Sequence, residues 1–177
     1  MKEEVILVNE GDQPLGTMEK MEAHRIGVLH RAFSVFIFNR LGEMMLQQRA
    51  FSKYHSPGLW TNACCSHPRD GETVVQAGIR RLHEEMGFTT PLEKIFDFIY
   101  KADVGQGLTE HELDHVLVGR FDDVPQINPE EVADWKWISL EALQMEMIKS
   151  PENFTIWFRI ALPELLRHLD PGDQNAI

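Results

Sequence analysis

The sequence predicts an α/β (α+β) protein in which a mixed β-sheet is covered by α-helices. Two observations support this fold class. Short runs of β-branched and aromatic residues recur along the chain, and helix starts with capping residues follow several of them. The 177 residues can form one sizeable hydrophobic core and do not require two domains. We therefore expect a single domain over residues 1–170 and a flexible polar tail at residues 171–177.

The expected strands share a high content of β-branched and aromatic residues, with turn residues at their ends. They cover residues 5–8, 32–38, 44–46, 95–100, 112–121 and 135–138. Turn-forming residues at 39–42 separate the second run from the third, so these two runs predict a hairpin. Helices between the remaining strands favour a mixed sheet.

Three helices are expected, each marked by a residue that can cap its start. The first covers residues 73–86, and the second begins after Ser139. The third begins at Ser150-Pro151 and continues through Trp157 toward His168, because the missing N–H of proline costs least in the first turn.

The helix over residues 73–86 carries an apolar stripe that faces the core. Arg81 and Glu85 flank this stripe, whereas Arg80 and Glu84 point mostly away from it. Arg81 and Glu85 are therefore the better candidates to line an internal pocket.

Charge and composition exclude several classes of partner. A formal net charge of −11 argues against nucleic acid, whose backbone requires an excess of Lys and Arg. No apolar run is long enough to span a membrane, and the acidic start does not resemble a secretory signal, so we expect a cytoplasmic protein. The two cysteines are neighbours and are expected to be free thiols. An anionic substrate still has candidate cations, namely Arg49, Lys53, Arg69, Arg80 and Arg81.

Cys65 and His67 form the first candidate for chemistry. In an extended segment, residues two apart project to the same side, so the thiol and the imidazole share a face while Cys64 points the other way. The alternative is that both cysteines are small buried hydrophobes beside an unrelated histidine.

Glu110 and Glu112 also project together if their segment is a strand, and could jointly bind a cation. With His24, His30 and His67 they make a plausible five-ligand set for an octahedral divalent metal. The alternative is that these glutamates are solvated on an edge strand. The donor types accept Mn²⁺, Mg²⁺, Zn²⁺ or Fe²⁺.

The cations and aromatics near these groups also have two interpretations. Arg81 and Glu85 could serve a phosphate site or form an ordinary i, i+4 ion pair. Trp60, Tyr100 and Trp157 are either core residues or ring faces that stabilise a cationic intermediate.

The helix and the loop before it resemble the Nudix box, which reads Gly, five residues, Glu, seven residues, then Arg-Glu-U-x-Glu-Glu-x-Gly-U, where U is aliphatic. The residues that occupy the register of this box are Ser66, Glu72, Arg80, Leu82, Glu84, Glu85, Gly87 and Phe88. Ser66 replaces the usual Gly, and Arg81 replaces the first Glu of the helical part. The second change removes a metal ligand typical of the hydrolases and adds a phosphate donor, which favours holding a diphosphate intact.

Within that superfamily, nearly the whole chain resembles the type I isopentenyl-diphosphate Δ-isomerases. The most specific shared element is Thr61-Asn62-x-x-Cys65-x-His67-Pro68. Further shared motifs lie at residues 16–20, 22–24, 29–34, 48–53, 57–60, 80–82 and 110–112. One departure is that five residues separate His24 from His30, where the family pattern has six.

The resemblance implies a Nudix-type mixed sheet between helices and a role for each matching residue. It implies that Cys65, Glu112 and Tyr100 are catalytic. A structural and catalytic metal would be held by His24, His30, His67, Glu110 and Glu112. A second, substrate-linked Mg²⁺ would be held by Glu85 and the Cys65 carbonyl. The diphosphate would be bound by Lys20, Arg49, Lys53, Ser66 and Arg81, with Trp157 as an aromatic lid.

The implied reaction interconverts isopentenyl diphosphate and dimethylallyl diphosphate through a carbocation-like intermediate. The implied partner is thus a small isoprenoid diphosphate, with neither nucleic acid nor a membrane involved, and we expect a monomer, with a weak dimer as the alternative. Two other functions are considered: a Nudix pyrophosphohydrolase, suggested by Glu72, Glu84 and Glu85, and a binding module in which metal serves only folding.

Overall fold

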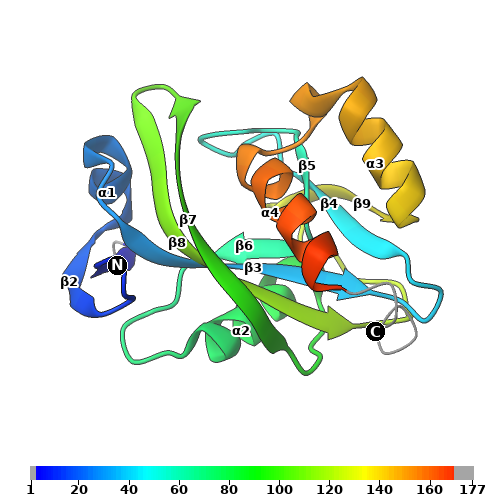
Figure 1. Ribbon diagram of the computed structural model, residues 1–177, viewed down its shortest axis with the longest axis horizontal. Coiled ribbons are helices and arrows are strands. Elements are labelled where there is room, and N and C mark those ends of the chain that lie inside the picture. The colour runs from blue at the N-terminus through cyan, green and yellow to red at the C-terminus, as the bar shows by residue number, and fades with distance from the viewer. Residues whose placement is uncertain (1–2, 170–177) are drawn as a thin grey trace.

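The computed structural model describes residues 3–169, and the expected tail at 171–177 lies outside them. In this part of the chain, a nine-stranded mixed sheet with helices on both faces confirms the predicted fold class (Figure 1). The strands are β1 (Glu4–Val8), β2 (Pro14–Glu19), β3 (His30–Phe38), β4 (Met44–Arg49), β5 (Trp60–Thr61), β6 (Cys64–Ser66), β7 (Glu93–Gly105), β8 (Leu108–Arg120) and β9 (Val132–Ile138). The helices are α1 (Lys20–Ile26), α2 (Val74–Met86), α3 (Leu140–Lys149), the 3-10 turn η1 (Pro151–Asn153) and α4 (Ile156–His168).

Strand β3 organises the sheet because it pairs along both edges. One edge runs parallel to β8 over its whole length, from His30 opposite Glu112 to Phe38 opposite Arg120. The other edge pairs antiparallel with both β1 and β6. Strands β7 and β8 form a long hairpin, and β4 pairs with β5 and β9. The elements that carry chemistry, β6 and β8, therefore lie on opposite sides of β3.

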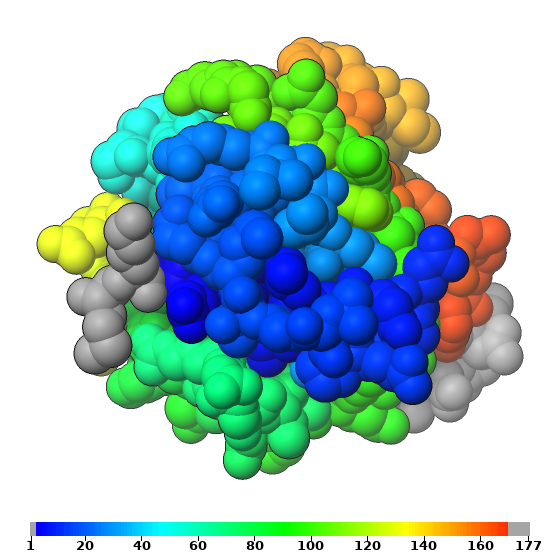
Figure 2. Space-filling model, turned by 90° about the vertical axis from the view of Figure 1, so that its left-hand side faces the viewer, coloured from blue at the N-terminus to red at the C-terminus, as the bar shows by residue number. Residues whose placement is uncertain are grey.

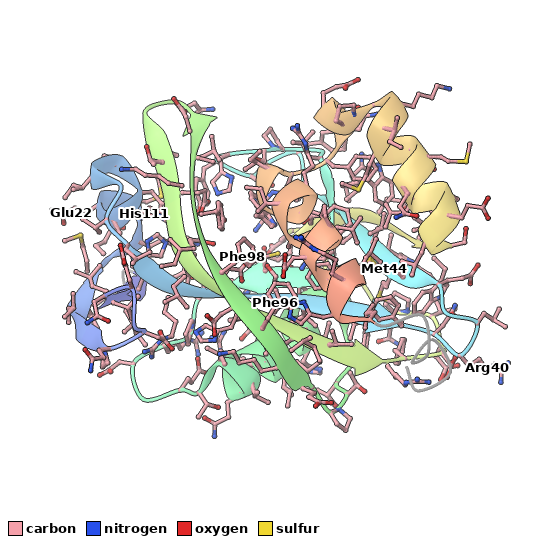
Figure 3. All side chains as sticks on the ribbon, in the orientation of Figure 1. Glu22, Arg40, Met44, Phe96, Phe98 and His111 are labelled. Atoms are coloured by element: carbon pink, nitrogen blue, oxygen red, sulfur yellow. The ribbon has the colours of Figure 1, made fainter. Side chains whose placement is uncertain are left out.

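Alternation along β3 divides the core between the two faces of the sheet. Phe33, Val35 and Ile37 pack in the cluster that contains residues of α2. Phe36 and Phe38 pack in the cluster that contains residues of α3 and α4. In Figure 1, α2 lies on one side of the sheet and α4 with α3 on the other, and Figure 3 places Phe96 and Phe98 of β7 beside α4. The residues of β3 with even numbers thus face α4.

The expected third helix was wrong in one respect, because the structure divides it into η1 and α4. Phe154 between them is extended, with φ −118° and ψ 146°. Thr155 donates its N–H to the carbonyl of Trp60 at 3.0 Å, and Phe154 bridges Trp60 as a strand would. This contact with β5 interrupts the helix and fixes where α4 begins.

The N-terminal segment closes one end of the sheet, as Figure 2 shows for β1, β2 and α1. Helix α1 was not predicted, and its start is capped by Glu19, whose carboxylate accepts from two backbone N–H groups. His111 of β8 lies beside α1 in Figure 3, with its Nδ1 2.9 Å from the Gly27 carbonyl oxygen. Among the described helices, none has the length and apolar character needed to cross a membrane.

Candidate active site and metal centre

A polar pocket collects the predicted site residues on the face of the sheet that carries α4. Its walls come from α1, β4, β6, α2, β7, β8, α4 and the loop after β4. All residues expected to be catalytic, to bind substrate or to hold the second metal line it: Cys65, Glu112, Tyr100, Lys20, Arg49, Lys53, Ser66, Arg81, Trp157 and Glu85. His67 and Glu110 line it as well, while His24 and His30 are fully buried.

The strand register places Glu112 between two partners. On β8, Glu112 lies opposite His30 of β3 on one side and opposite Tyr100 of β7 on the other. The Tyr100 hydroxyl donates to Glu112 Oε2 at 2.8 Å, and His30 Nε2 lies 3.5 Å from Oε1. Burial alone would raise the pKa of Glu112, but interactions with His30, Glu110 and the Tyr100 hydroxyl lower the pKa to about 2. Glu112 is therefore a rigidly held carboxylate.

Three imidazoles converge on the two carboxylates. His67 Nε2 lies 2.9 Å from Glu112 Oε1, and His24 Nε2 lies 3.4 Å from Glu110 Oε1. The rings of His24 and His30 are 4.9 Å apart between centroids. The five residues expected to bind metal thus meet at one place, and the shortened spacing before His30 does not remove His24 from the group.

The orientation of these imidazoles fits a divalent metal ion. His24 Nδ1 lies 2.6 Å from the Lys20 carbonyl oxygen, and His30 Nδ1 lies 2.9 Å from that of Val28. Because a carbonyl only accepts, both Nδ1 atoms carry the proton, and both Nε2 lone pairs face the group. These buried Nε2 atoms have no hydrogen-bond partner among the described residues. Burial, reinforced by His30, lowers the pKa of His67 well below its usual value, so its imidazole is neutral.

His55 joins this group without having been predicted. Its side chain is 5% exposed, and its Nε2 lies 2.9 Å from Glu110 Oε1. The ring stacks on that of His24 at 6.3 Å and meets Trp157 edge-on at 5.7 Å. His55 lies in an irregular loop, so no periodicity in the sequence indicated where its side chain would point.

The Cys65 thiol is held from two sides. Asn62 donates its amide N–H groups to the carbonyl oxygens of Val35 and Cys64. Its Oδ1 accepts the Cys65 S–H, with a distance of 3.0 Å between Sγ and Oδ1. Trp157 donates its indole N–H to Cys65 Sγ at 3.1 Å. Burial, followed by the charge of Asp114, raises the pKa of Cys65 to about 12. Cys65 is therefore a protonated thiol with a defined S–H direction.

Cys64 and Cys65 separate to opposite faces, as the alternation predicted. Cys65 lies opposite Ser34 of β3 and borders the pocket. Cys64 is fully buried in the cluster on the α2 face.

Arg49, Lys53 and Arg81 also line the pocket, and two of these three cations are already paired with carboxylates. Arg81 donates to Glu85 at 2.6 Å and to Glu84 at 2.7 Å, and lies 3.4 Å from Glu131. Lys53 pairs with Glu131 as well. The Arg49 guanidinium lies over the ring of Trp157, 5.3 Å from its centroid.

Three residues considered for this site lie elsewhere. Arg80 pairs with Glu72 at 2.7 Å, and together with Arg69 it lines a different hollow. Trp60 does not line the pocket and lies under the Lys136 ammonium, 4.7 Å from its ring centroid. The cation cluster in the sequence was therefore divided by the fold, and only part of it faces the pocket.

Comparison with known proteins identifies the class first. Residues 28–158 match the NUDIX domain, to which family the chain belongs. The fold is similar to that of a Deinococcus radiodurans protein of known crystal structure, with a TM-score of 0.70, 22% identity and coverage of 83% of this chain and 90% of that one. A MutT protein from Methanosarcina mazei gives a TM-score of 0.67 at 17% identity, covering 80% and 96%.

The closer group within that class follows from curated relatives. The chain is 50% identical over 165 residues to the isopentenyl-diphosphate Delta-isomerase of Serratia proteamaculans, covering 93% of this chain and 92% of the relative. It is 51% identical over 162 residues to the isopentenyl-diphosphate Delta-isomerase of Pectobacterium atrosepticum, covering 92% and 90%. The chain belongs to the isopentenyl-diphosphate Delta-isomerase family.

Proposed function

We propose that the chain interconverts isopentenyl diphosphate and dimethylallyl diphosphate by moving a proton on and another off the carbon chain. The isomerase class follows from family membership. The observation that supports the mechanism is the placement of Cys65 and Glu112 on β6 and β8, which flank β3 and face one pocket. Strands on either side of a third are separated by about 10 Å. Cys65 lies opposite Ser34 and Glu112 opposite His30, so the two side chains are also offset along β3, with room for a branched five-carbon chain between them.

The reaction adds a proton to the terminal alkene carbon and removes a proton from the carbon two positions away, so the double bond moves by one bond and charge is conserved. An alkene is a very weak base, so the donor must be held against the π bond in a site that excludes water. Cys65 and Glu112 divide these two tasks, and exchange them when the reaction runs backward. Tyr100 donates to Glu112 and Trp157 donates to Cys65, so both groups are fixed in position.

A positive charge develops at the branched carbon between the two proton transfers. The buried rings of Tyr100 and Trp157, both in the pocket lining, would stabilise it by cation–π attraction of about 2 kcal/mol or more when desolvated. The Glu112 carboxylate supplies the opposing charge. Trp157 thus serves both the thiol and the carbocation.

A divalent ion would be held by His24, His30, His67, Glu110 and Glu112, and we propose Mn²⁺, Mg²⁺ or Zn²⁺ at this position. When bound, such an ion tunes the acidity of Glu112 and keeps it rigid.

At the other end of the pocket, Glu85 and the Cys65 carbonyl are proposed to hold the Mg²⁺ that enters with the diphosphate. The cations there would anchor the diphosphate oxygens through charge-assisted hydrogen bonds. The residues proposed to bind the diphosphate are Lys20, Arg49, Lys53, Ser66 and Arg81, all of which line the pocket.

The test is proton NMR of isopentenyl diphosphate incubated with the protein and Mg²⁺ in heavy water. We expect the vinylidene signals to disappear and deuterium to enter the product. Cys65→Ala and Glu112→Gln should each lower the rate by at least about 10³-fold while leaving the protein folded. Cys64→Ala is the matched control, because Cys64 lies on the other face of the sheet, and should retain activity. Normal turnover in either Cys65→Ala or Glu112→Gln would refute the mechanism.

Release of phosphate in the same tube would instead indicate hydrolysis. The position of Arg81 argues against it, because a guanidinium paired with Glu85 and Glu84 stands where the Nudix box has a metal-binding carboxylate. Monomeric state, cytoplasmic location and independence from nucleic acid and membranes stay predictions.

A further inference from the structure

The buried imidazoles form two possible metal-binding groups that share a single residue. One contains His24, His30, His67 and Glu112, and the other contains His24, His55 and Glu110. Within each group, the donor atoms lie within 4.8 Å of one another. His55 belongs only to the second group. Whether it binds the same ion as His30, His67 and Glu112 therefore depends on whether the two groups hold one ion or two.

The chemistry of His24 decides between one ion and two. Its Nδ1 proton is committed to the Lys20 carbonyl oxygen at 2.6 Å, so only the Nε2 lone pair is free to bind metal. One nitrogen lone pair binds one ion. If both groups bind metal, the ion must draw them onto a single centre. The donors around it would then number six: His24, His30, His55, His67, Glu110 and Glu112.

The separations between each carboxylate and its neighbouring imidazoles are close to an octahedral edge, whereas the six donor atoms do not all lie within 4.8 Å of one another and must move together to share one ion. With bonds of about 2.1 Å, adjacent donors of an octahedron lie about 3 Å apart. Glu110 Oε1 lies 2.9 Å from His55 and 3.4 Å from His24. Glu112 Oε1 lies 2.9 Å from His67 and 3.5 Å from His30. Each carboxylate thus has two imidazole nitrogens at distances close to an octahedral edge.

The other ring nitrogen of His55, Nδ1, also has a hydrogen-bond partner away from the two carboxylates. Its Nδ1 lies 3.3 Å from Ser56 Oγ, which can accept the ring proton and leave Nε2 free. Arg49 donates to the His55 backbone carbonyl at 3.2 Å, which holds this part of the loop in place. His55 is therefore oriented as His24 and His30 are, with one nitrogen tied to the protein and the other facing the carboxylates.

We propose that His55 is the sixth protein ligand of this metal and closes its coordination sphere. This inference rests on the metal site of the proposed function and deepens it. A closed sphere is typical of a structural ion, whereas a catalytic ion keeps a position for water or substrate. The ion would then act only by holding and polarising Glu112, and the substrate alkene would meet side chains alone.

The experiment counts water molecules bound directly to Mn²⁺, used as the probe at no more than one equivalent per chain. Without diphosphate the second site lacks the ligands its substrate supplies, so the probe reports on the buried centre. Broadening of the Mn²⁺ electron paramagnetic resonance lines by ¹⁷O-labelled water measures these waters. We expect no broadening in the unmodified protein and broadening equivalent to one water in His55→Ala.

His55→Gln separates metal ligation by His55 from hydrogen bonding to Glu110. The glutamine amide N–H can still donate to Glu110, but the variant has no imidazole nitrogen at this position to bind the metal. Ligation predicts that His55→Gln gains a water as His55→Ala does. His83→Gln is the matched control, since His83 is exposed on α2. The Mn²⁺ lines of this variant should not be broadened by ¹⁷O-labelled water. A directly bound water in the unmodified protein that is unchanged in both His55 variants would overturn the proposal. The readout does not depend on turnover, so it is independent of the isomerase assay.

Discussion

The two ends of the pocket have opposite electrostatic needs. We call one the imidazole end, formed by His24, His30, His55, His67, Glu110 and Glu112, and the other the cation end, formed by Arg49, Lys53, Arg81, Glu85 and Glu131. At the imidazole end, the buried Nε2 atoms of His24 and His30 face carboxylates without a hydrogen-bond partner among the described residues. At the cation end, Arg81 and Lys53 are already paired with carboxylates, and their side chains are 19% and 22% exposed.

This difference indicates how each end binds. The imidazole end has a donor set that a divalent ion would complete, because imidazole lone pairs and carboxylates otherwise face one another in a dry site. At the cation end, Lys53 and Arg81 are paired with carboxylates, so a diphosphate bound there as proposed would compete with Glu85 and Glu131 for these two donors. In the proposed mechanism, Glu85 would bind the Mg²⁺ that enters with the diphosphate and so release part of its hold on Arg81. The first end is therefore expected to govern stability, and the second to govern substrate affinity.

The largest expected effect comes from reversing a charge at the cation end. Arg81→Glu restores the carboxylate of the Nudix box, removes a donor to the diphosphate and adds a charge beside Glu84 and Glu85. We expect kcat/KM for isopentenyl diphosphate to fall by about 10³-fold, or ~4 kcal/mol. Steady-state kinetics measures it, with Arg80→Glu outside the pocket as the control. A loss of less than tenfold would mean that Arg81 does not bind substrate.

Metal removal should affect the imidazole end next. An ion at 100 to 1,000 times its Kd stabilises the folded state by roughly 3–4 kcal/mol, so chelation should lower Tm by ~5–15 °C. Thermal unfolding with and without chelator and added Mn²⁺ measures the shift. His30→Ala should abolish the response, whereas Glu131→Gln should retain it. Equal Tm values in all conditions would contradict a structural ion.

A smaller effect is expected at Asn62, between the two ends. Asn62→Ala removes the acceptor that directs the Cys65 S–H, so kcat should fall by ~10-fold with little change in KM, equivalent to a hydrogen bond of ~1–1.5 kcal/mol. The S–H stretching band in a Cys64→Ala background should shift toward that of a free thiol, while the thermal unfolding transition shows that the variant is folded. An unchanged band would show that Asn62 does not orient the thiol.

The smallest effect is expected at Glu131, which competes with substrate for Lys53 and Arg81. Glu131→Gln should lower KM by about 2- to 5-fold, because interactions with partly exposed charges are worth less than ~1 kcal/mol. Isomerase kinetics checks this, and a raised KM would show instead that Glu131 holds the cations in place for substrate.

Glu131 also predicts a pH dependence of stability. Burial raises its pKa, but hydrogen bonding and charge from Lys53 and Arg81 lower it below the usual value of 4.5. The pairing therefore stabilises the protein above pH 4.5 and is lost as the pH falls through the lowered pKa. The difference in unfolding free energy between the unmodified protein and Glu131→Gln should shrink over that interval. Denaturant titrations from pH 7 to pH 3.5 would detect it, and a constant difference would contradict it.

Much of the site could be predicted because strand alternation is local. The period of two that places Glu110 with Glu112, and Cys65 with His67, needs only the geometry of an extended chain. Helix α2 was equally predictable, since Thr73 and Gln76 form a capping box and Gly87 ends it in a left-handed conformation.

Three features were missed for physical reasons. Helix α1 has only seven residues and is capped by Glu19 rather than by a common capping residue. The break before α4 arises because Thr155 bonds to Trp60, far away in the sequence. His55 lies in a loop whose conformation depends on contacts with Arg49 and Trp157. In the last two cases a tertiary contact outweighed local preference.

The sequence alone determined which donors are available and which neighbours share a face, because both depend on residue type and on the repeat of the extended chain. Only the tertiary structure decided that His30, Glu112 and Tyr100 stand side by side on three strands, and that Trp157 reaches a thiol 92 residues away. Strand register and helix docking are set by packing of distant apolar residues on both faces of β3, which no local pattern encodes.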